Sequence, residues 1–131
     1  MAKALQTIVI VLSLTGILAA CSHEQDQVEV AARTAELYYG YLLSGDVGSF
    51  VEGIDGYAKL PEAYQAELRG NAGMFAEKQK KVHGGLRSVT AERCEADSTV
   101  GEVFMTFAYG DGTKEQVLVP MVRRLGLWYM R

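Results

Sequence analysis

The chain has 131 residues, of which 13 are basic and 16 are acidic, so its formal net charge at pH 7 is −3. This length suits one domain built around a single hydrophobic core. The sequence shows no basic patch of the kind that nucleic acids require, so nucleic acid is not an expected partner.

The first 20 residues are expected to form a secretory signal peptide. A single lysine precedes an apolar run over residues 7–18, and small residues close the segment. The run is shorter than the ~20 apolar residues of a membrane-spanning helix. Residues 18–21, Leu-Ala-Ala-Cys, resemble a bacterial lipobox. That resemblance implies cleavage between Ala20 and Cys21, and acylation of both the thiol and the new amino group of Cys21.

Lipidation predicts a location at the cell envelope, on the outer membrane. Whether the domain faces the periplasm or the cell surface is left open. Residues 21–26 are then a lipidated polar tether, and residues 27–131 form the domain. Two or more acyl chains hold a protein firmly on a membrane, whereas one binds only marginally. The alternative is a plain secreted protein cut after Ala20. An acylated Cys21 would leave Cys94 without a disulfide partner.

Three helices are expected over residues 27–83. Apolar side chains recur at helical spacing in the first, which should end at Gly45, a residue suited to a left-handed cap. Asp46 can cap a short second helix, and Pro61 suits the first turn of a third, which ends near His83. The apolar face of the first helix consists of Val28, Ala31, Ala35, Tyr38 and Leu42.

The third predicted helix contains a stripe of small residues, Ala66, Gly70 and Gly73, at helical spacing. Each interior glycine costs about 1 kcal/mol relative to alanine. A close approach of another backbone segment would compensate for this cost, so the stripe is expected to pack against the first helix or the sheet.

After His83 the apolar pattern changes to a period of two, which predicts strands. The first strand covers residues 86–96, and Val103, Met105, Phe107 and Tyr109 alternate with other residues in the second. Residues 110–113, Gly-Asp-Gly-Thr, suit a hairpin connection to a third strand. Pro120 in that strand favours an edge or a bulge. Residues 127–130 form the last strand.

This order of elements resembles the nuclear-transport-factor-2-like, or cystatin-like, superfamily. More closely, it is similar to small Gram-negative envelope lipoproteins that carry a domain of unknown function from that superfamily. The resemblance implies an α+β fold in which three N-terminal helices pack on a curved antiparallel sheet of about four strands, giving a cone. The matching stretches are residues 41–46, 60–64, 83–85, 109–115 and 126–129.

Enzymes of this superfamily place an acid or a base inside the cone. The carboxylates nearest to elements that could line a cone are Asp55, Glu102 and Glu115. No pair of titratable groups stands out among them, so no catalytic residue is assigned. The histidines, His23 and His83, lie far apart in the sequence, and neither a metal site nor a cofactor is expected.

Aromatic side chains are the better indication of a site, because several could line a concave pocket. Tyrosines also straddle the boundary between a core and water, so the preferred interpretation is that most of them belong to the core. The candidate pocket residues are Tyr38, Tyr41, Tyr57, Tyr64, Phe107, Tyr109 and Trp128, with Met105 and Met121 as pliable walls.

The leading hypothesis is a lipid-anchored, non-catalytic envelope domain that binds a small ligand or a partner protein. One alternative is a small isomerase or hydrolase, which a carboxylate beside an apolar pocket floor would favour. The other is a structural module that forms a homodimer through its sheet, as superfamily members often do. An exposed apolar sheet face over a filled core would favour that dimer.

Overall fold

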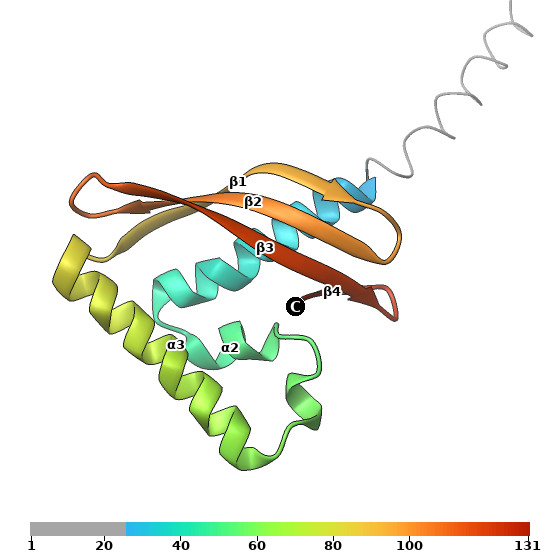
Figure 1. Ribbon diagram of the computed structural model, residues 1–131, viewed down its shortest axis with the longest axis horizontal. Helices are drawn as coiled ribbons and strands as arrows, with labels where there is room; N and C mark the ends of the chain where they lie inside the picture. The colour runs from blue at the N-terminus through green and yellow to red at the C-terminus, as the bar shows by residue number, and fades with distance from the viewer. Residues whose placement is uncertain (1–25) are drawn as a thin grey trace, which may run out of the picture.

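The computed structural model describes residues 26–131. The expected signal peptide, the cysteine expected to be acylated and most of the expected tether lie outside them (Figure 1). A first helix over residues 26–44 is followed by α2 (Val47–Glu52), a short 3-10 helix η1 (Tyr57–Lys59) and α3 (Glu62–His83). Four strands come next: β1 (Leu86–Ala96), β2 (Val100–Tyr109), β3 (Lys114–Arg124) and β4 (Leu127–Met130). None of the helices in residues 26–131 is long and apolar enough to cross a membrane.

The strands form one antiparallel sheet in the order β1-β2-β3-β4, and the helices cover one of its faces (Figure 1). The register of β1 against β2 shifts twice, between Leu86 and Ser88 and between Ala91 and Arg93. Such irregularities bend a strand and increase its local twist, so they help to curve the sheet around the first helix. The predicted fold, helices on one face of a curved four-stranded meander, is confirmed.

Local signals at three of the helix ends act as the sequence predicts, while Pro61, expected in the first turn of α3, is the N-cap residue that precedes this helix. Gly45 adopts a φ of +85°, which allows the first helix to stop and the chain to reverse. The Asp46 side chain then accepts a hydrogen bond of 3.2 Å from the Ser49 backbone N–H and so caps α2. Gly84 ends α3 with a φ of +75°. These caps hold the helices in the order and directions that the sheet requires.

The core lies between the sheet and the first helix. Every second residue of β2 from Val103 to Tyr109 is buried, which confirms the predicted alternation. Pro120 lies on β3 where β4 ends, and its carbonyl accepts a hydrogen bond of 2.9 Å from the Arg131 N–H. The N–H that proline lacks would point to the same side as this carbonyl, away from β2. The proline therefore leaves the β2–β3 ladder intact.

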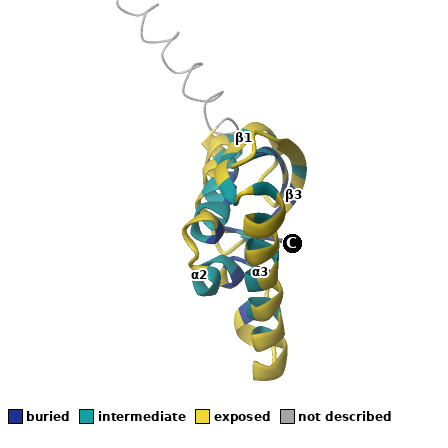
Figure 2. Cartoon of the chain, turned by 90° about the vertical axis from the view of Figure 1, so that its left-hand side faces the viewer, coloured by how far each residue is buried: buried dark blue, intermediate teal, exposed yellow. Residues whose placement is uncertain are grey.

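The expected packing of the small-residue stripe on α3 is wrong. A Cβ atom added to Gly70 or Gly73 would meet nothing within 4 Å. Only the middle of α3, residues 68–76, packs inward, while the rest of the helix is largely exposed (Figure 2). A helix attached to the core along such a short length has no close backbone partner for its glycines.

Candidate functional site

A pocket of about 250 Å³ opens between the helices and the inner face of the sheet. It lies where the core under the sheet meets a second hydrophobic cluster formed by the first helix, α2 and α3. The volume falls just below the ~300–1,000 Å³ of typical small-molecule sites, so it suits a small ligand. The lining residues are Tyr39, Leu42, Phe50, Ala72, Phe75, Phe107, Glu115 and Val117.

Aromatic rings form much of this lining, and Tyr39 lies at their centre. Its ring centroid is 5.1 Å from that of Phe50 on α2 and 5.1 Å from that of Phe107 on β2. These separations and tilted orientations are favourable for aromatic pairs, which hold the rings in place. Burial raises the pKa of the Tyr39 hydroxyl, which therefore stays protonated. The pocket thus has rigid, mostly apolar walls.

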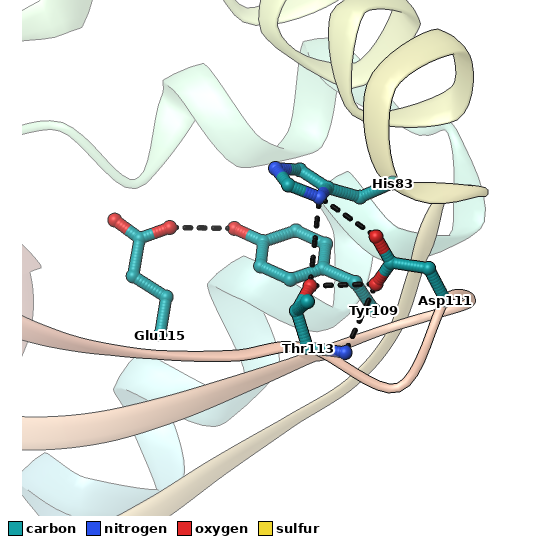
Figure 3. A network of polar contacts seen from close by, with 5 residues as sticks. All are labelled: His83, Tyr109, Asp111, Thr113 and Glu115. Carbon is teal, nitrogen blue, oxygen red and sulfur yellow. Dashed lines mark hydrogen bonds and ion pairs between the residues drawn. The ribbon is translucent and has the colours of Figure 1, made fainter.

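One carboxylate, that of Glu115, lies among these walls. Glu115 pairs directly with Phe107 across β2 and β3, so both side chains leave the sheet on its helix-facing side. The Tyr109 hydroxyl donates a hydrogen bond of 2.8 Å to Glu115 Oε2 (Figure 3). Burial and this contact with Glu115 raise the pKa of Tyr109 to about 12, so the hydroxyl remains a donor.

A second polar group lies beside Tyr109. The ring of His83, the last residue of α3, packs at a centroid distance of 5.0 Å from the Tyr109 ring. Its Nδ1 lies 2.9 Å from Asp111 Oδ2, and its other ring nitrogen is turned away from Asp111 (Figure 3). Asp111 also accepts hydrogen bonds from the hydroxyl and the backbone N–H of Thr113. The network ties the end of α3 to the β2–β3 hairpin.

We expect the Asp111 contacts to make the stability of the fold depend on pH in acid. Hydrogen bonds from the Thr113 hydroxyl and N–H, and then from His83, lower the pKa of Asp111 to about 2. Because an unfolded aspartate titrates near ~3.9, the stabilisation is complete above that pH and is lost as the pH falls towards ~2. Asp111→Asn should therefore flatten this part of the curve of unfolding free energy against pH.

Denaturant unfolding of the wild type and of Asp111→Asn at several pH values between ~2 and ~5 measures the difference. Asp55 and Asp97 also have lowered pKa values, so the variant should keep a residual slope. Equal slopes for the two proteins would show that the Asp111 contacts contribute nothing.

The structure distributes the sequence-predicted pocket residues over several places. Phe107 is the one among them that lines the 250 Å³ pocket, and Met105 lies beside it in the core. Tyr38 donates a hydrogen bond of 2.8 Å to the Trp128 carbonyl, and Trp128 itself is buried at 2% exposure. Tyr38 and Trp128 therefore join the first helix to β4.

Of the remaining tyrosines, Tyr57 belongs to the second cluster and Tyr109 to the main core. Tyr57 is buried and accepts a hydrogen bond of 2.6 Å from Arg69. Tyr41 is half-buried on the first helix, and Tyr64 is exposed on α3. Tyr109 and Met121 are both buried beneath the helices.

The other two candidate carboxylates lie away from this pocket. Asp55 accepts two hydrogen bonds from the Arg124 guanidinium, of 2.7 and 2.9 Å, and these lower its pKa. Glu102 pairs with Pro120 and is exposed on the outer face of the sheet. Cys94 is a half-buried free thiol whose pKa is raised by burial and by Glu95. Within residues 26–131, no cluster of side chains could hold a metal ion.

A larger hollow, of about 440 Å³, lies against the outer face of the sheet. Its walls are mixed, because apolar side chains alternate with the polar side chains of Glu92, Arg93 and Gln116. The Arg93 guanidinium lies 4.1 Å from the centroid of the Phe104 ring and partly covers it. We favour the inner pocket as the site, because aromatic walls around a single carboxylate are better suited to hold a small molecule.

Comparison with known proteins identifies the fold. A crystal structure of a Campylobacter jejuni protein, provisionally named an NTF2-like transpeptidase, matches this chain with a TM-score of 0.59 and 15% sequence identity. The match covers 73% of this chain and 92% of the other. No protein-family model and no curated protein matches the sequence. The chain therefore has an NTF2-like fold, and at this identity the likeness concerns the fold alone.

Proposed function

We propose that this chain is a lipid-anchored, non-catalytic domain of the cell envelope that binds a small ligand in its inner pocket. The observation that carries the proposal is the pocket itself, with aromatic walls from three helices and the sheet around one carboxylate. An NTF2-like cone is an architecture that suits either ligand binding or catalysis. The Phe107 floor and the rings around Tyr39 supply the apolar contact area that such binding needs.

The binding claim is tested with 2-phenylethanol, a neutral probe with one ring and one hydroxyl group. Calorimetric titration of the purified full-length chain should give a Kd of about 1 mM or tighter, as expected for so few atoms. Ala72→Leu should abolish binding, because Ala72 is buried in the pocket wall and a larger side chain would fill the space. The matched control is Ala66→Leu, at an exposed position of the same helix. Equal binding by both variants would contradict the proposal.

The anchor rests on residues 18–21 and is tested separately. Cys21→Ser should accumulate as uncut precursor or as a differently cut chain, and mass spectrometry should find no acyl groups on it. If Cys21→Ser is acylated and cut like the wild type, the anchor is wrong. A disulfide between Cys21 and Cys94 in the mature protein would also overturn it.

A second candidate function is a small isomerase, because Glu115 is a carboxylate beside the apolar floor made by Phe107. A base in that place could remove a proton next to a carbonyl group, and the hydrogen bond from the Tyr109 hydroxyl would hold the carboxylate in position. Exchange of the acetophenone methyl protons with deuterated water, followed by NMR, separates the two candidates. A rate above that of buffer, lost in Glu115→Gln, would favour the enzyme.

A further inference from the structure

The position of Glu115 indicates which chemical class of ligand the inner pocket would select. The helix-facing side of β3 carries Glu115, Val117, Val119 and Met121. All of these except Glu115 are apolar. Among the residues that line the pocket, Glu115 is the charged one. It is also exposed at the pocket mouth, so a ligand can reach its carboxylate without disturbing the core.

The charge of Glu115 has no cationic partner among residues 26–131. The ion pairs of this part of the chain involve other carboxylates, such as Asp55 with Arg124 and Glu62 with Arg69. Glu115 Oε2 accepts its hydrogen bond from the neutral Tyr109 hydroxyl, which positions the carboxylate without neutralising it (Figure 3). The other oxygen, Oε1, is therefore available to a ligand.

The aromatic rings favour the same sign of charge. The faces of aromatic rings are electron-rich and attract ammonium groups, most strongly where water is partly excluded. Four rings line this pocket, those of Tyr39, Phe50, Phe75 and Phe107. Phe107 lies directly across the strand pair from Glu115, so its ring and the carboxylate leave the sheet side by side. A bound anion would face repulsion from both.

We propose that the ligand of the inner pocket is a small organic cation, a protonated or quaternary amine with an apolar body. Its ammonium group would contact the Glu115 carboxylate, and its apolar body would lie against the rings around Tyr39. This inference rests on the proposed ligand-binding function and adds the chemical class of the ligand. It also predicts discrimination against carboxylates of the same size, which the neutral walls alone would not provide.

Three probes of similar shape test the selectivity: phenethylammonium, 2-phenylethanol and 3-phenylpropanoate. Titrations of the full-length chain at pH 7 should give the cation an affinity about tenfold above that of the alcohol, and the anion the weakest affinity. Glu115→Gln should lower the ratio of cation to alcohol affinity by about tenfold. The amide has nearly the same shape and can still accept the hydrogen bond from Tyr109.

The control variant is Glu102→Gln, which removes the same charge from the outer face of the neighbouring strand. It should keep the wild-type ratio of cation to alcohol affinity. If Glu102→Gln and Glu115→Gln lower this ratio equally, only the net charge matters, and the inference is overturned. If the alcohol binds as well as the cation, and Ala72→Leu abolishes the binding of both, the pocket is a binding site but the cation inference is wrong. If none of the three probes binds, the proposed function itself fails.

Discussion

Replacing Trp128 with alanine is expected to lower the free energy of unfolding by about 3–5 kcal/mol. The side chain is 2% exposed and belongs to the main core between the sheet and the first helix. Its indole N–H donates a hydrogen bond of 3.3 Å to the Gln27 side chain, and its ring lies over Gly101 on β2. Domains of this size have a total stability of ~5–15 kcal/mol, so the loss would leave much of the population unfolded at modest denaturant concentrations.

Urea titrations followed by circular dichroism measure this effect, because the variant lacks the chain's one tryptophan and with it the natural fluorescence probe. The matched control is Leu127→Ala, since Leu127 precedes Trp128 on β4 and is 60% exposed. The control should change stability by less than ~0.5 kcal/mol. An unchanged midpoint for Trp128→Ala together with lost binding of the probes would place Trp128 in a ligand site.

Most of the fold could be predicted because its signals are local. A period of two marks the inward residues of β2, and Gly45 and Gly84 stop helices with positive φ angles. The packing of α3 could not be predicted in this way. Helical spacing shows which residues share a face, but it cannot show how much of a long helix reaches the core. Gly70 is accordingly exposed, although it belongs to a regular stripe.

The candidate site was only partly predictable, for a related reason. Helical periodicity places Tyr38 on the buried face, and Tyr38 indeed contacts β4. Its neighbour Tyr39 is at the centre of the pocket because the first helix lies between the sheet and the other helices, and so is buried on more than one side. The signal for Glu115 was present in the sequence, since Glu115 is in phase with Val117 on the inward side of β3.

Gly110→Ala is expected to lower the free energy of unfolding by about 1–3 kcal/mol. A Cβ atom at this position would lie 2.4 Å from the Gly84 carbonyl oxygen and 2.9 Å from its carbon, both of which are backbone atoms. Two backbone hydrogen bonds join the hairpin to the end of α3. The Gly110 N–H donates to the Gly85 carbonyl at 2.8 Å, and the Asp111 N–H donates to the His83 carbonyl at 2.9 Å. Room for a methyl group would therefore require the β2–β3 hairpin to move away from the end of α3.

The same substitution at Gly70 is the matched control, because it adds one methyl group to an exposed helical position with nothing within 4 Å. Gly70→Ala should raise the free energy of unfolding by about 1 kcal/mol through helix propensity. Urea midpoints measured with equal m-values should thus move in opposite directions for the two variants. If the Gly110→Ala midpoint equals that of the wild type, the hairpin can move away from the end of α3 without loss of stability, and the prediction is wrong. A shifted hairpin would carry Tyr109 and Glu115 with it, so Gly110→Ala should also weaken the binding of phenethylammonium in whatever fraction stays folded.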